Sequence, residues 1–239
     1  MPDNKRIKLL NKLEKVLGIK FSEIKLLSQA LTHKSFKANE SSVIFDNERL
    51  EFLGDAVLKL LVADYLFKRY PEQQEGELSK KQAMFVSDKM LAKKAGDLDL
   101  GSYMQLGINE ERQDVSGLDS TLANAMEALF GAYYLDQGIE KCKKVVLGLL
   151  QKSLDQEEDL DYLKDYKTIL QEINQEQGLG TPEYRVIEES GPSHNKTFTI
   201  EVTILLNGKQ LTAIATGKTK KKAEQTVARE IYNKLQAET

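Results

Sequence analysis

The sequence predicts two domains, an all-α N-terminal domain followed by a small α-β-β-β-α domain with an antiparallel three-stranded sheet. Two apolar helical runs, Phe52–Phe67 and Ser120–Leu135, occupy the first part of the chain. Five acidic residues then crowd into residues 155–161, which is typical of a linker because like charges repel one another. After residue 184, short runs of β-type residues replace the helical pattern.

Composition limits the possible classes of function. The 239 residues suffice for two modest domains, and the net charge of −3 gives no overall basic field for nucleic acid. The single Cys142 and the two histidines, His33 and His194, exclude internal disulfides and Cys- or His-rich metal sites. The sequence shows no apolar run of membrane-spanning length and no signal peptide, so we expect a cytoplasmic protein without a membrane partner.

Periodicity and capping residues predict the remaining N-terminal helices. They are expected over residues 5–17, 21–31, 78–95 and 139–154. Ser22 is the expected cap of the second of these helices, and Ser120 or Thr121 the expected start of the second apolar run. Residues 72–77 are predicted to form an acidic turn, and residues 108–119 a polar loop.

The C-terminal pattern begins with a helix over Tyr166–Gln177, which Gly178 closes. The predicted strands are Tyr184–Glu189, Thr197–Leu206 and Lys209–Thr216, and the final helix is Lys220–Leu235 with an apolar inner stripe. Asn207-Gly208 is a strong signal for a two-residue hairpin. The domain boundaries that we predict are residues 3–154, a linker at 155–163, and residues 164–236.

The first apolar helix carries acids that a buried helix should not carry. Glu51 and Asp55 lie four residues apart and share one face, and Glu48 lies one turn earlier. An unpaired carboxylate in a packed interior is costly, or it takes up a proton. The helix therefore needs a counter-charge, and we expect no basic residue on that face from the neighbouring sequence.

The second apolar helix shows the same feature. Glu127 is its one charge, and Asn124 lies three residues earlier on the same face. Two buried helices that each present a pair of oxygen-bearing side chains can share a hard cation such as Mg²⁺ or Mn²⁺. In the alternative interpretation, Arg side chains or backbone N–H groups satisfy Asp55 and Glu127. The residues alone leave both interpretations open.

A family resemblance decides between them. Asn47–Ala56, Asn-Glu-Arg-Leu-Glu-Phe-Leu-Gly-Asp-Ala, resembles the signature of ribonuclease III, and Asn124–Leu129 resembles that family's second acidic motif. Residues 165–172, 191–194 and 220–224 resemble the three usual segments of a double-stranded-RNA-binding domain. The resemblance covers almost the whole chain, in the order usual for bacterial members of the family.

The resemblance implies an endonuclease domain that depends on Mg²⁺, for which Mn²⁺ can substitute. It implies cleavage of double-stranded RNA to 5′-phosphate and 3′-hydroxyl ends with short 3′ overhangs, in the processing of rRNA and mRNA. The implied metal ligands are Glu51, Asp55, Asn124 and Glu127, with Asp55 and Glu127 as catalytic residues. The family also has acids at the positions of Glu48 and Glu75, near the dimer junction and the catalytic valley, so the resemblance makes both second-tier site candidates. It also implies that an aromatic at the position of Phe52 plugs into the partner of a homodimer.

One residue departs from the family pattern. Bacterial members usually have Asp where this chain has Asn124, and an amide can bind a hard cation but brings no charge. We therefore expect weaker metal affinity and a higher Mg²⁺ optimum. The main alternative is a regulatory protein that binds double-stranded RNA with a weak or lapsed nuclease site. A phosphohydrolase for other substrates is disfavoured by the C-terminal domain.

The physical case for RNA binding is clearest at Lys220, Lys221 and Lys222. Thr219 is predicted to cap their helix, and a helix N-terminus with a lysine cluster is a strong anion site. By the resemblance, two further groups contact minor grooves of the duplex, which such domains recognise by shape. These groups are Thr168, Gln171 and Glu172 on the first helix, and Pro192, Ser193 and His194 in a loop.

Overall fold

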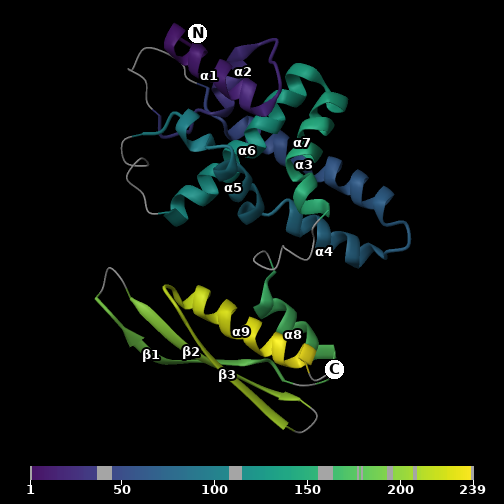
Figure 1. Ribbon diagram of the computed structural model, residues 1–239, viewed down its shortest axis with the longest axis vertical. Helices are drawn as coiled ribbons and strands as arrows, with labels where there is room; N and C mark the ends of the chain where they lie inside the picture. The colour runs from purple at the N-terminus through teal and green to yellow at the C-terminus, as the bar shows by residue number, and fades with distance from the viewer. Residues whose placement is uncertain are drawn as a thin grey trace. The chain divides into compact units, whose positions relative to one another are not determined.

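The computed structural model describes residues 2–36, 45–107, 115–155, 164–176, 178, 180–192, 196–206 and 209–237. The chain forms two compact units, which we call the N-terminal unit (Met1–Leu163) and the C-terminal unit (Lys164–Thr239) (Figure 1). Each is described by itself. None of the described helices combines the length and the apolarity that a membrane span needs.

The N-terminal unit is helical, as predicted. Its elements are α1 (Asn4–Leu17), α2 (Ile24–Ala30), α3 (Glu48–Arg69), α4 (Glu75–Phe85), α5 (Asp88–Asp97), the 3₁₀ helix η1 (Leu100–Tyr103), α6 (Val115–Gln137) and α7 (Ile139–Asp155). The long helices α3 and α6 pack against each other, and α2, α5 and α7 pack on α6. Nearly every apolar side chain of α6 from Leu122 to Tyr133 is buried, so this helix forms the centre of the core.

Two glycines allow α3 and α6 to approach closely. A Cβ atom on Gly54 of α3 would lie 1.8 Å from the backbone oxygen of Glu127, and one on Gly131 of α6 would lie 2.3 Å from the backbone oxygen of Leu50. No side chain fits at either position, because the obstructing atoms are backbone atoms. The two helices therefore cross at the residues that carry the predicted acidic site.

Helix α3 is not buried on all sides, which corrects the expectation from its apolar run. Leu58, Val62 and Leu66 are enclosed in the core, but Phe52 is 82% exposed, and Leu60 and Phe67 are exposed too. The apolar run therefore serves two faces. One face packs on α6, and the other lies on the surface of this single chain.

The predicted helix over residues 78–95 was wrong, because the chain forms α4 and α5 there. Ser87 has an extended backbone, and its hydroxyl accepts a hydrogen bond from the Met90 N–H at 3.4 Å, so it caps α5. Helix α4 also begins three residues before the predicted start. The Glu77 carboxylate accepts from the Gln74 N–H at 3.1 Å, which draws the end of the predicted acidic turn into the helix.

Two predicted helix starts also differ. Ser22 does not cap α2, because the N-cap position is Glu23 and the Ser22 hydroxyl accepts from the Gln137 side chain of α6 at 2.7 Å. The backbone N–H groups of Ser22 and Glu23 donate to the Asp136 carboxylate, at 2.7 and 2.8 Å. Helix α6 begins at Val115 instead of Ser120 or Thr121. Serine and threonine are tolerated inside helices as well as at their caps, so neither residue fixed the start.

The C-terminal unit has the predicted α-β-β-β-α order. Helix α8 (Tyr166–Glu176) precedes the strands β1 (Glu183–Ser190), β2 (Thr197–Leu206) and β3 (Lys209–Gly217), and α9 (Lys220–Ala237) ends the unit. The sheet is antiparallel in the order β1-β2-β3, and α9 covers one face with α8 beside it (Figure 1). The predicted inner stripe of α9 is buried: Ala223, Val227, Ala228, Ile231 and Leu235. The predicted turn at Asn207-Gly208 lies outside the described residues.

Candidate active site

The crossing of α3 and α6 brings the predicted acidic residues together. Glu51 and Asp55 lie one turn apart on α3, and Asn124 and Glu127 occupy the facing turn of α6. The Asn124 side chain donates a hydrogen bond to the Glu51 carboxylate, so the pairs are linked across the two helices. All four side chains are only partly buried, at the edge of the core, which corrects the expectation of acids enclosed in a packed interior.

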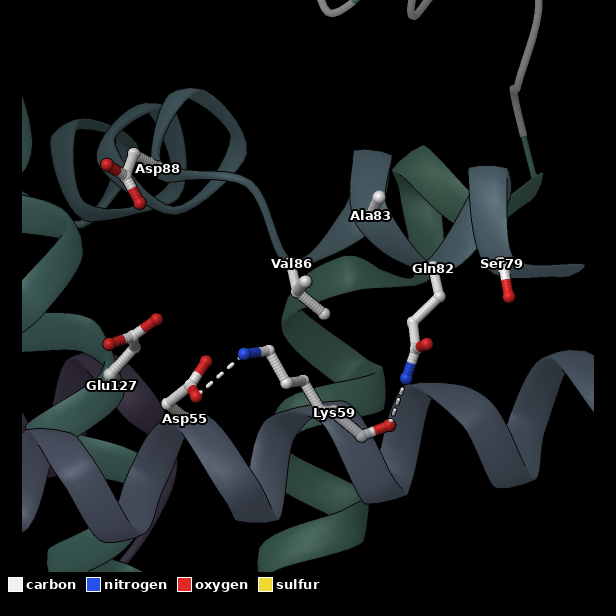
Figure 2. A pocket seen from close by; sticks show the side chains of 8 residues that line it. All are labelled: Asp55, Lys59, Ser79, Gln82, Ala83, Val86, Asp88 and Glu127. Atoms are coloured by element: carbon white, nitrogen blue, oxygen red, sulfur yellow. Dashed lines mark hydrogen bonds and ion pairs between the residues drawn. The ribbon is translucent and has the colours of Figure 1, made fainter.

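A cavity of about 360 Å³ opens beside this crossing (Figure 2). Asp55 and Lys59 of α3, Glu127 of α6 and Asp88 of α5 present their charged groups to it. The rest of its lining comes from α4 and its end, at Ser79, Gln82, Ala83 and Val86. The carboxylates of three helices thus face one opening.

Asp55 has a basic partner, contrary to our expectation from the sequence. The Lys59 ammonium, one turn later on α3, lies 2.8 Å from Asp55 Oδ2. The pair is partly exposed, since the Lys59 side chain is 53% and the Asp55 side chain 36% exposed. The i, i+4 spacing places the two side chains on one helical face, so this partner could have been found from the sequence.

The electrostatics of the site are dominated by negative charge. Burial, followed by the neighbouring carboxylates Asp55, Glu51 and Asp88, raises the pKa of Glu127 to about 7, and Lys59 only partly offsets them. Burial and then Glu48 raise the pKa of Glu51, against the opposing effects of Lys34 and the Asn124 hydrogen bond. In Glu127 and Glu51, burial and like charges together outweigh the nearby cations and disfavour the ionised carboxylate.

The donor set fits a hard divalent cation, although its side chains would have to turn. Within the described ranges, no three His, Cys, Asp or Glu side chains converge closely enough to hold an ion as they stand. Asp55 is directed at Lys59 and would have to leave it. The available donors, carboxylate and amide oxygens, are those that Mg²⁺ and Mn²⁺ prefer, and burial, followed by the neighbouring carboxylates, raises the pKa of Glu127.

A second polar cavity of about 270 Å³ lies on the Glu51 side of the site. Its lining residues are His33, Lys34, Asn47, Glu48, Glu51, Ser120, Thr121 and Asn124. Glu48 is paired there with Lys34, with its carboxylate 2.8 Å from the amine. His33 Nδ1 lies 2.8 Å from the Ser35 hydroxyl, so this imidazole is engaged in a local hydrogen bond.

Glu75 and Phe52 lie outside these two linings. Glu75 is in the first turn of α4, where its carboxylate accepts a hydrogen bond from the Ser79 hydroxyl at 2.7 Å. Phe52 follows Glu51 on α3 and points to the surface. The structure therefore separates Glu75 from the acids that face the two cavities.

Sequence reasoning missed several residues that shape the site. Asp88 was assigned to the middle of a continuous helix, so nothing in the sequence brought it to Glu127. Gly54 lies inside the Asn47–Ala56 motif, and a lone glycine in a helical run is a general signal of close packing. Asn47 is almost fully buried, its N–H donates to the Thr32 carbonyl at 2.9 Å, and its Nδ2 finds no partner among the described residues.

The C-terminal unit presents its predicted RNA-binding residues at the surface. Lys220, Lys221 and Lys222 are exposed in the first turn of α9, and the Thr219 hydroxyl accepts from the Lys222 N–H at 3.1 Å, which confirms the predicted cap. Thr168, Gln171 and Glu172 share one face of α8, with Thr168 and Gln171 exposed. Pro192 is exposed, whereas Ser193 and His194 lie outside the described residues.

Comparison with known proteins assigns both units. The family model described as ribonuclease-III-like matches residues 23–154, and the double-stranded RNA binding motif matches residues 166–235. Ribonuclease 3 of Nitratiruptor sp. is 45% identical over 97% of this chain and 99% of its own length. Ribonuclease 3 of Treponema denticola is 40% identical over 98% of this chain and 94% of its own length.

The chain belongs to the ribonuclease III family. It is a double-strand-specific endoribonuclease, and its C-terminal unit is a double-stranded-RNA-binding domain. Members of this family are generally metal-dependent. The nuclease domain of ribonuclease III from Campylobacter jejuni is 43% identical, with a TM-score of 0.55, over 60% of this chain and 96% of its own. That structure is described as showing flexibility in a region involved in its dimer formation.

Proposed function

We propose that this endoribonuclease uses Mg²⁺, with Mn²⁺ as a substitute, held by Glu51, Asp55, Asn124 and Glu127. One observation supports the proposal: these oxygen donors lie on facing turns of α3 and α6, which Gly54 and Gly131 let cross at backbone contact. The crossing fixes the spacing of the donors through the backbone. A shared ion would require these side chains to turn toward it.

The chain's residues have separable tasks. Asn124 holds Glu51 in position across the helices, through its hydrogen bond. Glu127, with its pKa raised to about 7, would hold the ion as a carboxylate, so its deprotonation and ion binding would be coupled. When bound, a divalent ion supplies an activated water and stabilises charge on the scissile phosphate. Glu48, which lines the second cavity, and Glu75, which lies outside both linings, are proposed as second-tier acids.

We propose that the products carry 5′-phosphates and 3′-hydroxyls and that paired cuts leave short 3′ overhangs. Paired cuts require a second subunit. Phe52, with 82% of its surface exposed beside Glu51, is the proposed dimer contact. The proposed setting is the cytoplasm, and the proposed substrates are duplexes in rRNA precursors and mRNAs.

The C-terminal unit is proposed to hold the duplex through three groups. The lysines of α9 would contact phosphates, because they add positive charge to a capped helix N-terminus. The exposed face of α8, with Thr168, Gln171 and Glu172, would contact 2′-hydroxyls in one minor groove. The loop with Pro192, Ser193 and His194 would enter the next minor groove.

A long RNA duplex incubated with Mg²⁺ or with a chelator tests the metal dependence. Cleavage is expected only with the metal. Because the proposed products carry 5′-phosphates, a kinase should add a labelled phosphate to their 5′ ends only after phosphatase treatment. Glu127→Gln should reduce the cleavage rate by about 100-fold or more, because it removes a proposed metal ligand while keeping the shape of the side chain. Glu140→Gln, an exposed change on α7, is the matched control and should leave the rate unchanged.

One alternative is favoured by two specific observations. Asn124 brings no charge to the site, and Lys59 neutralises part of Asp55. Both weaken the attraction for a cation, as expected for a protein that binds double-stranded RNA with a weak or lapsed nuclease site. Retardation of the duplex without cleavage at any Mg²⁺ or Mn²⁺ concentration would select this alternative and refute the proposal.

A further inference from the structure

Lys59 occupies an unusual place in the site, because it is the one cation among the described residues that line the larger cavity. Its amine lies 2.8 Å from Asp55 Oδ2 and points across the opening toward Asp55 (Figure 2). The acids Asp88 and Glu127 face the same opening from other helices. The amine thus lies among the carboxylates that the proposed metal site uses.

A divalent ion and this amine compete for the same carboxylate. An ion shared by Asp55 and Glu127 would place two positive charges close to the ammonium group, and like charges at a few ångströms repel strongly even near the surface. The present geometry also directs one Asp55 oxygen to the amine instead of to Glu127. Ion binding therefore favours release of Lys59.

The Lys59 side chain can leave without disturbing the fold. Its backbone is fixed, because the Gln82 Nε2 group of α4 donates to the Lys59 carbonyl oxygen at 2.8 Å. Its side chain is half exposed, and such exposed i, i+4 pairs are among the weakest ion pairs in proteins. The amine can therefore swing within the cavity while α3 and α4 stay in place.

We propose that Lys59 exchanges partners during the reaction cycle, an inference that rests on the proposed metal-dependent function. In the metal-free protein, its ammonium neutralises Asp55. When a divalent ion takes Asp55, the released ammonium binds a phosphate of the RNA strand that enters the same cavity. Lys59 thus lowers metal affinity but supplies a phosphate contact at the centre.

Metal affinity measured without RNA tests whether Lys59 and the ion compete for Asp55. Titration calorimetry of the full chain with Mn²⁺ should show about fivefold to tenfold tighter binding for Lys59→Met, because the competing charge is gone. Lys59→Arg keeps the charge and should stay within about twofold of the unmodified chain. Lys68→Met is the matched control, because Lys68 forms the same i, i+4 pair on α3 with Asp64, at 2.5 Å, away from the cavity lining. It should leave the affinity unchanged.

The single-turnover cleavage rate at saturating metal tests whether the released Lys59 binds an RNA phosphate. Lys59→Met should cleave at least about tenfold more slowly despite its tighter metal binding, Lys59→Arg should recover most of the rate, and Lys68→Met should keep all of it. Equal Mn²⁺ affinity in Lys59→Met and the unmodified chain would overturn the exchange. An unchanged cleavage rate in Lys59→Met would overturn the phosphate contact. If the unmodified chain binds Mn²⁺ but never cleaves, the proposed function fails. The Mn²⁺ affinities of Lys59→Met and the unmodified chain would still test whether Lys59 competes with the ion for Asp55.

Discussion

The two units present charge to RNA in opposite ways. In the N-terminal unit, acids from three helices face one cavity: the partly buried Asp55 and Glu127, where α3 and α6 cross at Gly54 and Gly131, and the exposed Asp88 of α5. In the C-terminal unit, exposed lysines come from the first turn of one helix, directly after the Thr219 cap. The acidic site therefore depends on tertiary packing, whereas the basic site is built locally. Packing changes should damage the first site, and charge changes should damage the second.

The largest expected effect comes from Gly54→Ala, which should break the packing-dependent site. The new methyl group would meet the Glu127 backbone oxygen at 1.8 Å, so α3 and α6 must separate. We expect a loss of about 3 kcal/mol or more in the unfolding free energy, measured by urea denaturation. Gly148→Ala on α7 is the control, because its Cβ would meet nothing within 4 Å and should stabilise by up to about 1 kcal/mol. Equal stability of the two variants would contradict the close crossing.

Replacement of Lys220, Lys221 and Lys222 together by Gln should damage the locally built site without unfolding it. The salt dependence of binding to double-stranded RNA should fall, with the slope of log affinity against log salt smaller by about two to three, and affinity should drop at least about tenfold. Lys234→Gln, at the other end of α9, is expected to change the slope little. If the triple change left the slope unaltered, the phosphate-binding role of this helix start would be wrong.

Asn124→Asp should sharpen the acidic site by restoring the charge that the family usually has there. We expect the Mg²⁺ concentration for half-maximal cleavage to fall several-fold, because a carboxylate attracts the ion more strongly than an amide. Asn11→Asp on α1, which adds the same charge but lines neither cavity, should leave the requirement unchanged. An unchanged or higher Mg²⁺ requirement in Asn124→Asp would refute the argument.

The smallest expected effect is the pH dependence of stability that Glu127 of the acidic site contributes. The pKa of Glu127 is about 7 in the folded protein, against 4.5 for ordinary glutamate. Between these values the folded state holds more protons than the unfolded chain, so the stability of the metal-free protein falls as pH rises from about 4.5 to about 7. Solvent screening of this partly buried group limits the loss to about 1–2 kcal/mol.

Glu127→Gln provides the comparison for this pH effect, because its amide does not titrate. Urea unfolding in the presence of a chelator, repeated across that pH range, should show the variant less dependent on pH than the unmodified chain. Parallel pH profiles for the two proteins would mean that Glu127 ionises normally in the fold.

The same contrast explains what the sequence could predict. The cap at Thr219 and the buried stripe of α9 depend on neighbours within a few residues, and both were predicted correctly. The facing of Glu51 and Asp55 on α3 follows from helical spacing alone. The break between α4 and α5 was missed because Ser87 lies in an otherwise continuous helical pattern. Without that break, Asp88 could not be placed at the start of a helix that faces Glu127.

The errors at the acids have physical reasons as well. An apolar run does not distinguish a buried helix from one with an exposed apolar face, so Phe52, Leu60 and Phe67 made α3 look enclosed. That interpretation made the acids seem isolated, and the exposed amine of Lys59 was discounted. Gly54 and Glu127 are 73 positions apart in the sequence, so only the packed structure reveals that they lie close together.

Crystals of the chain soaked in Mn²⁺ provide the most direct test of the acidic site, through the anomalous scattering of the ion. We expect a peak between α3 and α6, within ordinary metal–oxygen distance of both Asp55 and Glu127, with Lys59 turned away from Asp55. A peak bound to one helix alone, or no peak while Asp55 stays paired with Lys59, would contradict the shared site.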